Sequence, residues 1–307
     1  MAKELKPIIE VENGFDEQGS FMLTTIRMGK ANIYSYLLAS LSDYQEIYPL
    51  DAVRGEEETE EEYNVRQLHL MASSKQSAIE VAYKKAEIPI EYEYKGVYVL
   101  NVVDNMPAAD KLQPGDRIFK INGHEFTSSE EFIEFVSKQT AGTEITLTYL
   151  RRGEEESTTI QVQPFPDDAT RVGVGIGLVD DKELHVNPNV EIKTDDIGGP
   201  SAGFMFSLEI YNQLIEEDLT KGYAIAGTGT ISADGKVGRI GGIEQKIVAA
   251  DKAGAEIFFA PNEQGAKDSN YNAAIKTAKD INTKMKIVPI DTFDEAIDYL
   301  KELQPKK

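Results

Sequence analysis

Cysteine is absent from this chain of 307 residues, which excludes disulfide bonds, thiol nucleophiles and zinc sites built on cysteine. Histidine is scarce, and His69, His124 and His185 are scattered along the chain. None of them has the His-Glu-x-x-His spacing of a zinc peptidase. A histidine-based catalytic triad and a metal-dependent hydrolase are therefore poor fits, and we expect no metal and no cofactor.

Basic residues are also few: 32 Lys and Arg stand against 53 Asp and Glu, for a formal net charge of -21. This balance argues against nucleic acid or an anionic membrane surface as the main partner.

The longest apolar stretch, residues 31–41, is too short and too polar to span a bilayer. The chain start lacks the apolar region of a signal peptide, and no Gly-x-x-x-x-Gly-Lys-Ser/Thr string indicates an ATP site.

The segment Ile-Gly-Gly-Pro-Ser-Ala-Gly at residues 197–203 combines a tight turn with a serine. Apolar residues follow it at helical spacing, namely Phe204, Leu208, Tyr211 and Ile215. Ser201 is thus expected at a helix N-terminus, where unpaired backbone N–H groups favour a developing oxyanion. The neighbouring candidate residues of this oxyanion and nucleophile turn are Gly199, Pro200 and Ala202.

A second segment, Gly-Gly-Ile-Glu-Gln-Lys at residues 241–246, supplies a candidate base. The apolar helical stretch that surrounds Lys246 would desolvate its ammonium group and lower its pKa. A neutral lysine can accept the proton of a serine hydroxyl, so the two segments suggest a serine hydrolase whose base is a lysine.

Three elements in this order resemble the proteolytic domain of Lon-type peptidases, which use a Ser-Lys dyad. They are the Gly-Pro-Ser-Ala-Gly string ending at Gly203, the pair Thr228-Gly229, and the Gly-Gly-x-x-x-Lys element ending at Lys246. The resemblance implies that Thr228 hydrogen-bonds Lys246 and orients it. Because the ATPase module of the cytosolic Lon enzymes has no counterpart here, it also implies an ATP-independent serine endopeptidase.

Other interpretations stay open. The serine segment alone could be a helix-starting turn with Ser201 as a cap, and a single lysine on an apolar helix face usually extends its charge to solvent. The chain could be a catalytically silent scaffold that binds peptides, or a hydrolase of small esters or amides.

The middle of the chain resembles a PDZ domain over residues 90–165, with Leu-Gln-Pro-Gly-Asp-Arg-Ile at 112–118 as its most specific string. The expected elements are strands at 95–103, 144–150 and 157–162, a loop at 104–109, and a helix at 128–139 with a capping box of Ser128 and Glu131.

PDZ domains capture a peptide as an added strand, and the resemblance places this edge on residues 95–103, opposite the helix. The candidate peptide-binding residues are Gly96, Val97, Tyr98 and Val99. A PDZ fold that serves only as a spacer is the alternative. Gly173–Gly177 has the wrong spacing for a nucleotide-binding loop, and we expect a strand hairpin through residues 180–182 after it.

The predicted fold class is a multidomain α+β protein, with a PDZ domain (a β-sandwich or barrel with helices) and a Lon-type α/β proteolytic domain. Residues 1–89 should pack with the protease body, residues 90–165 form the PDZ domain, and residues 166–307 form the proteolytic domain. In the first region we expect a strand at 20–27 and helices at 34–41 and 59–86; the acidic run at 56–62 is expected to be a solvated helix start.

A PDZ domain followed by a Lon-type domain resembles the membrane-anchored PDZ-Lon peptidases of Gram-positive cell surfaces, the YlbL-like family. This implies action at the extracellular face of the plasma membrane, through an N-terminal transmembrane helix that this chain lacks. It also implies peptides or unfolded protein segments as partners, and a possible homo-hexamer.

Overall fold

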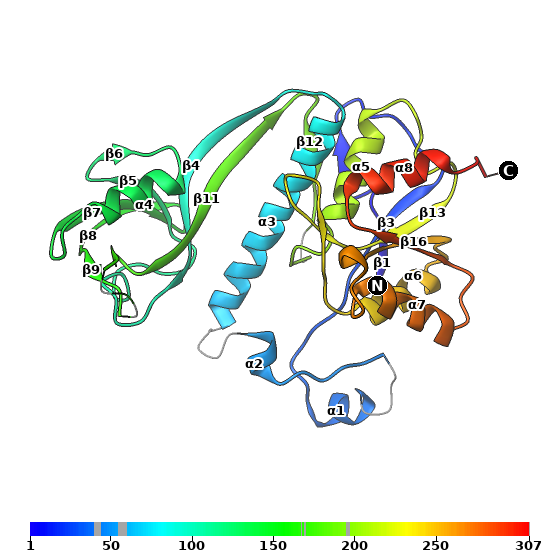
Figure 1. Ribbon diagram of the computed structural model, residues 1–307, viewed down its shortest axis with the longest axis horizontal. Coiled ribbons are helices and arrows are strands. Elements are labelled where there is room, and N and C mark those ends of the chain that lie inside the picture. Colours follow the sequence, from blue (N-terminus) through cyan, green and yellow to red (C-terminus); the bar gives the residue numbers. More distant parts are fainter. Residues whose placement is uncertain (40–43, 55–59, 167, 169, 195–196, 307) are drawn as a thin grey trace. The chain divides into compact units, whose positions relative to one another are not determined.

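The computed structural model describes residues 1–39, 44–54, 60–166, 168, 170–194 and 197–306 (Figure 1). The chain forms two compact units. We call the first the body; it consists of Met1–Gly55, Gln67–Ile90 and Val186–Lys307. The second, the insert, consists of Glu56–Arg66 and Glu91–His185.

The body is built around a five-stranded sheet of order β1-β3-β13-β16-β17. The strands are β1 (Ala2–Glu4), β3 (Ser20–Thr24), β13 (Ala224–Gly227), β16 (Ile257–Pro261) and β17 (Lys286–Ile290). β1 pairs with β3 in antiparallel fashion, and the other neighbours are parallel. The strand predicted at 20–27 therefore forms as β3, and it lies beside a strand from the far end of the sequence (Figure 1).

Both faces of this sheet are covered, which explains why β16 is apolar throughout. Its residues are all buried, and Phe258 and Phe259 belong to different core clusters because successive side chains point to opposite faces. The cluster of Phe259 includes residues of α5 (Gly203–Leu214), α8 (Phe293–Glu302) and α3 (Glu60–Lys85). The cluster of Phe258 includes residues of α6 (Ile243–Lys252) and α7 (Asn270–Asp280).

Shorter elements complete the body. They are β2 (Ile9–Val11) paired with β12 (Val190–Ile192), β14 (Thr230–Ile231) paired with β15 (Val237–Gly238), α1 (Ile33–Ala39), α2 (Leu50–Val53) and the 3-10 turn η1 (Glu263–Gly265). The helix expected at 34–41 corresponds to α1, and its last two residues lie outside the described residues, as does most of the acidic run at 56–62. The helix expected at 59–86 corresponds to α3.

The insert is a second sheet, of order β11-β4-β5-β7-β8 with β6 paired to β5. Its elements are β4 (Ile90–Val102), β5 (Arg117–Ile121), β6 (His124–Glu125), α4 (Ser129–Ser137), β7 (Glu144–Arg151), β8 (Glu154–Gln161), β9 (Gln163–Pro164), β10 (Val172–Gly173) and β11 (Ile176–Val186). Arg152 and Gly153 both have positive φ and join β7 to β8, as a tight hairpin turn requires.

Two local expectations differ from the structure. Ser128 caps α4 by accepting from Glu131 N, but the Glu131 carboxylate accepts from Thr127 instead of returning to Ser128. The hairpin expected through residues 180–182 is wrong, because β11 is continuous there. Since β11 pairs with β4, the insert ends at His185, whereas the sequence analysis placed the domain boundary after residue 165.

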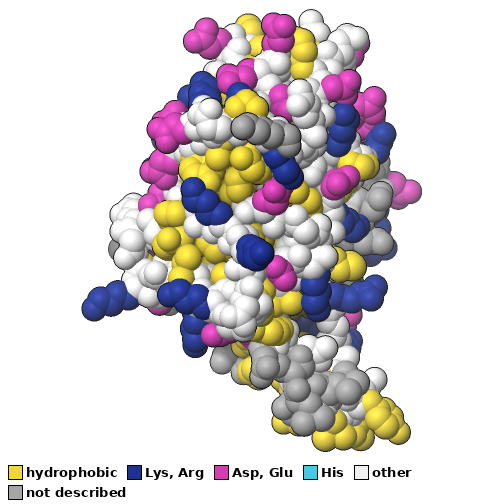
Figure 2. All heavy atoms as spheres, turned by 90° about the vertical axis from the view of Figure 1, so that its right-hand side faces the viewer, with side chains coloured by type: hydrophobic (Ala, Val, Ile, Leu, Met, Phe, Trp, Pro, Cys, Tyr) yellow, Lys and Arg dark blue, Asp and Glu magenta, His cyan; other side chains and the backbone are white. Residues whose placement is uncertain are grey.

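Large apolar side chains are exposed in the segment around α1 and α2, and Figure 2 shows hydrophobic side chains gathered at the lower end of its view. These residues are Ile26, Met28, Ile33, Tyr34, Tyr36, Leu37, Ile47, Tyr48 and Leu50. None of the helices in the described part of the chain combines the length and the apolar character needed to cross a bilayer.

A buried carboxylate in the insert generates a testable prediction. Asp116 is fully buried and accepts from Arg151 Nε at 2.9 Å, Arg151 Nη2 at 2.7 Å and Gln113 N at 2.9 Å. Asp116→Ala should destabilise the insert by about 2–4 kcal/mol, because Gln113 N and Arg151 Nε lose their acceptor and Arg151 Nη2 keeps only Lys111 O. Urea unfolding followed by hydrogen exchange in insert peptides measures this. The exposed Asp110→Ala is the control, and equal protection in the two variants would contradict the prediction.

Candidate active site

The serine segment forms a turn that leads directly into α5. Gly199 has a φ of 82°, a left-handed conformation that favours glycine. Ala202 is the N-cap residue of α5, so the half-buried Ser201 lies immediately before the helix cap, close to the expected position. Gly229 N donates to Ser201 O at 3.0 Å and fixes the turn against the chain that follows β13.

Helix α3 holds this turn from its other side. Ser74 Oγ donates to Pro200 O at 3.1 Å, and Gly199 N donates to Gln67 O at 3.4 Å. A Cβ atom on Gly203 would lie 2.3 Å from Ser74 Oγ, so only glycine allows α5 to begin this close to α3. A helix from the N-terminal third of the chain thus positions the candidate nucleophile.

Lys246 lies in the first turn of α6, and its side chain is only 1% exposed. Its Nζ donates to Ser201 Oγ at 2.8 Å and to Thr228 Oγ1 at 2.8 Å. Thr228 Oγ1 in turn donates to Ser201 O at 3.0 Å, so its single proton is used and a lone pair is left for Nζ. The structure therefore brings together Ser201, Thr228 and Lys246 at hydrogen-bonding distance.

Burial lowers the pKa of Lys246 from its ordinary value of 10.5 to about 7, because desolvation disfavours the ammonium form. Within the described residues, no carboxylate forms an ion pair with Lys246 that would restore the charge. A substantial fraction of the side chain is thus a neutral amine near neutral pH, which can accept a proton from a hydroxyl 2.8 Å away.

The turn residues differ in what they can offer an oxyanion. Pro200 has no N–H group, and the N–H of Gly199 is directed to Gln67 O. Of the three predicted turn residues, Ala202 is therefore the one whose backbone N–H, at the start of α5, suits an oxyanion beside Ser201.

The predicted peptide-binding strand in the insert is not an edge strand. β4 lies between β11 and β5 in the sheet, so both of its edges are paired. The side chains of Val97 and Val99 are fully buried in the core of the insert, Tyr98 pairs with Arg117, and a Cβ on Gly96 would lie 2.3 Å from Ile118 O. The assignment of peptide binding to Gly96, Val97, Tyr98 and Val99 is wrong, because β11 covers the edge that the sequence analysis left open.

The sheet of the insert ends instead at β11, one continuous strand where a hairpin of two strands was expected. Gly175, just before this strand, has a φ of 83°, and its carbonyl accepts from Val103 N at 2.9 Å. Ser129 N, at the start of α4, donates to Asp180 Oδ1 on β11 at 2.7 Å. The available signal is the glycine-rich run at 173–177, which leads directly into the apolar residues Leu178 and Val179 at the start of this strand.

Comparison with known proteins agrees with this description. The family model of the Lon protease (S16) C-terminal proteolytic domain matches residues 126–302, and that of the PDZ domain matches residues 70–162. The chain is 31% identical over 152 residues to a Lon protease of Metamycoplasma arthritidis, covering 49% of this chain and 17% of that protein. It is 34% identical over 125 residues to a Lon protease of Trichlorobacter lovleyi, covering 41% of this chain and 14% of that protein.

Among solved structures, the PDZ domain of the SdrC-like protein from Listeria monocytogenes is 36% identical, with a TM-score of 0.27; the match covers 28% of this chain and 90% of that one. The chain spans less than a fifth of the length of the curated relatives named above. The predicted fold class, a multidomain α+β protein, is confirmed. With more than half of its length matched by the proteolytic-domain model, the chain belongs to the Lon protease family and carries a PDZ domain as well.

Proposed function

We propose that this chain is an ATP-independent serine endopeptidase with Ser201 as nucleophile and Lys246 as general base. The observation that carries the proposal is the 2.8 Å contact between Lys246 Nζ and Ser201 Oγ at a buried lysine. Membership of the Lon protease family supports peptide-bond hydrolysis as the reaction. The chemistry of a Ser-Lys site needs only water as co-substrate, which supports a reaction that does not consume ATP.

The reaction follows from the positions of these groups. Neutral Lys246 Nζ takes the proton of Ser201 Oγ while Oγ bonds to the scissile carbonyl carbon, whose oxygen gains the electron pair and the negative charge. The N–H of Ala202 stabilises that charge. As the oxyanion collapses, the C–N bond breaks and the leaving amine takes the proton from the Lys246 ammonium. Water then repeats the sequence on the acyl-enzyme and releases the acid, and Thr228 keeps Nζ oriented throughout.

The PDZ domain would select the substrate through β11. In an extended strand, the N–H and C=O of alternate residues point to the same side. Because Gly175 O faces β4, the backbone polar groups of Ile176 and Leu178 point to the free edge, where a peptide can add as a further strand beside α4. The proposed substrates are peptides and unfolded or extended protein segments, because strand addition at β11 takes an extended chain. Location at the cell surface through a membrane anchor and assembly into a hexamer stay predictions of the family resemblance.

The first prediction concerns the dyad. The chain should cleave casein, Ser201→Ala should lower the rate by about 1,000-fold or more, and Lys246→Arg should be as inactive as Lys246→Ala, because an arginine cannot lose its proton. Lys252→Arg, on the exposed end of the same helix, is the matched control. Mass spectrometry of the digests measures cleavage. Intact casein with the wild type would favour the peptide-binding scaffold, and an active Lys246→Arg variant would refute the base assignment.

A second prediction concerns pH. Only neutral Lys246 can act as the base, and burial lowers its pKa to about 7. Peptidase activity should therefore rise as pH increases through about 7 and level off above it, with about a tenth of the plateau rate at one pH unit below the midpoint. Initial rates of cleavage of a fluorogenic peptide from pH 5.5 to 9 measure this. A flat profile would contradict it.

A third prediction concerns the PDZ edge. Leu178→Pro removes a backbone N–H that points to the free edge, while Leu178→Ala removes only the side chain. Leu178→Pro should weaken binding of a peptide substrate about tenfold more than Leu178→Ala does, and it should raise KM without changing kcat. Fluorescence anisotropy with the catalytically silenced Ser201→Ala background measures binding. Equal affinities of the two Leu178 variants would argue against strand addition at β11.

A further inference from the structure

The position of Lys246 depends on a short loop before α6. Gly242 is the N-cap residue of α6, in a left-handed conformation with φ 68° and ψ 41°, and its carbonyl accepts from Lys246 N at 3.1 Å. The Ile26 side chain lies 3.1 Å from where a Cβ on Gly242 would be. Lys246 is thus in the first helical turn, so any shift of the loop at residues 239–242 shifts its side chain.

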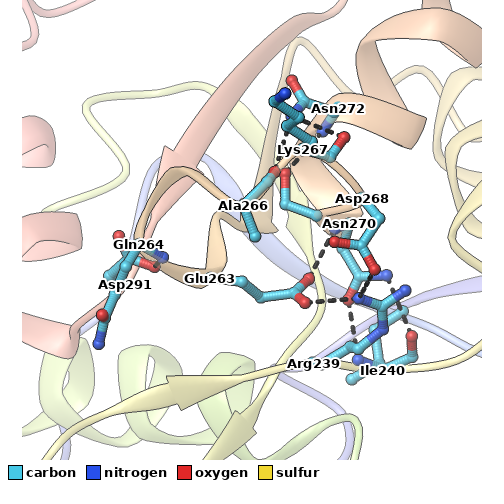
Figure 3. Close-up of polar contacts among 11 residues, drawn as sticks. Arg239, Ile240, Glu263, Gln264, Ala266, Lys267, Asp268, Asn270, Asn272 and Asp291 are labelled. Carbon is cyan, nitrogen blue, oxygen red and sulfur yellow. Dashed lines mark hydrogen bonds and ion pairs between the residues drawn. The ribbon is translucent and has the colours of Figure 1, made fainter.

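A buried asparagine on another helix holds this loop. Asn270, the first residue of α7, is 4% exposed. Its Oδ1 accepts from Ile240 N at 2.8 Å, and its Nδ2 donates to Ile240 O at 3.1 Å (Figure 3). The side-chain amide of Asn270 therefore forms hydrogen bonds with both the N–H and the C=O of Ile240, in the way that the backbone of a neighbouring β-strand would. Two bonds to the same residue fix the direction of the chain as well as its position.

A second contact ties the same helix start to the same loop through Glu263. Its Oε1 accepts from Asn270 N at 2.7 Å, and its Oε2 accepts from Arg239 Nη1 at 2.7 Å (Figure 3). Arg239 precedes Ile240, so consecutive loop residues are both tied to the start of α7. In this network both oxygens of the Glu263 carboxylate accept hydrogen bonds, and both the oxygen and the nitrogen of the Asn270 amide form one.

The turn that carries Glu263 is itself held in an unusual conformation. Glu263 and Gln264 have φ values of 54° and 56°, which are uncommon for residues other than glycine. Asp291 stabilises this turn, because its Oδ1 accepts from Gln264 N at 2.9 Å and its Oδ2 accepts from Asn262 Nδ2 at 3.0 Å. Strained backbone persists where surrounding contacts determine it and is found most often near functional sites.

We propose that Asn270 is a positioning residue for Lys246: by fixing Ile240, it sets where α6 begins and so directs Nζ toward Ser201 and Thr228. This inference rests on the proposed function. Asn270 does not touch the reacting atoms. A buried asparagine is costlier than an apolar residue unless both ends of its amide are paired, and here both are paired with the loop that leads to the base.

The test compares Asn270→Ala with Asn272→Ala. Asn272 lies on the same helix, but its Nδ2 donates to Ala266 O at 2.9 Å and Lys267 O at 3.4 Å, away from residues 239–242 (Figure 3). Asn270→Ala should lower kcat by about 10–100-fold with little change in KM, because misplacing a catalytic group by about 1 Å has effects of this size. Asn272→Ala should leave kcat within about twofold of the wild type.

Two further readouts separate positioning from a general loss of folded protein. A loosened loop admits water to Lys246, so the midpoint of the pH–rate profile should move upward by about half a unit or more in Asn270→Ala. Glu263→Gln keeps a neutral acceptor for Asn270 N, so this variant should also raise the midpoint of the pH–rate profile, but by less. Loss of folded protein would lower the rate without moving the midpoint.

Carbamylation of Lys246 by cyanate, mapped by mass spectrometry against pH, gives the same midpoint without requiring cleavage. An unchanged carbamylation midpoint in Asn270→Ala and Glu263→Gln, or equal losses of kcat in Asn270→Ala and Asn272→Ala, would overturn the inference. Failure of the proposed function is a separate result: the wild type would show no Ser201-dependent cleavage, while the carbamylation midpoints would still report the effect of Asn270.

Discussion

Removal of the Lys246 amine from water is the constraint on which the rest of the site depends. An ammonium group in an apolar interior is costly, and the protein reduces this cost by letting the group lose its proton. The neutral amine can then donate an N–H to the hydroxyl of Thr228 and accept the proton of the Ser201 hydroxyl, each at 2.8 Å. Desolvation and hydrogen bonding thus act together, since the groups that satisfy the buried amine are also those that orient it.

Burial at this point requires a sheet covered on both faces. Two consecutive phenylalanines of β16 show this arrangement. Phe258 packs in the same core cluster as residues of α6, the helix of the candidate base, and Phe259 packs with residues of α5, the helix that follows the candidate nucleophile. Ser201, in the turn that leads into α5, and Lys246, on α6, therefore come from different layers, and they meet at the end of β13, where Thr228 follows the strand. The polar atoms of Ser201, Thr228 and Lys246 thus lie at the end of a strand, where side chains from both layers come within hydrogen-bonding distance.

Much of this site could be predicted from sequence, because its residues belong to short motifs. Ser201, Thr228 and Lys246 each come with glycines that fix the local backbone, so their identity did not require knowledge of distant contacts. The element types of the insert were equally accessible: Arg152 and Gly153 indicate a hairpin, and Ser128 indicates a helix start. These signals are local, and the structure has them in nearly the expected places.

What could not be predicted are the contacts between segments far apart in the chain. β11 and β4 are separated by most of the insert, and the residues of neither strand indicate that the two pair, so the sequence alone leaves β4 at an edge of the sheet. The pairing of β3 with β13 and the contact between Asn270 and Ile240 are of the same kind. An asparagine at the start of a helix is common for local reasons, and only the fold reveals that its amide holds a loop of another element.

The sheet of the body joins strands that are far apart in the sequence, and this determines the order in which the two units can fold during synthesis. β3 leaves the ribosome early, but its parallel neighbour β13 is made only after the entire insert. Until then β3 and the body residues of α3 have no core to join, while the insert, whose strands are contiguous in sequence, has all its parts and can fold first. A nascent chain therefore cannot assemble Ser201 with Lys246 until translation has passed α6, so the site stays incomplete while the whole insert is being made.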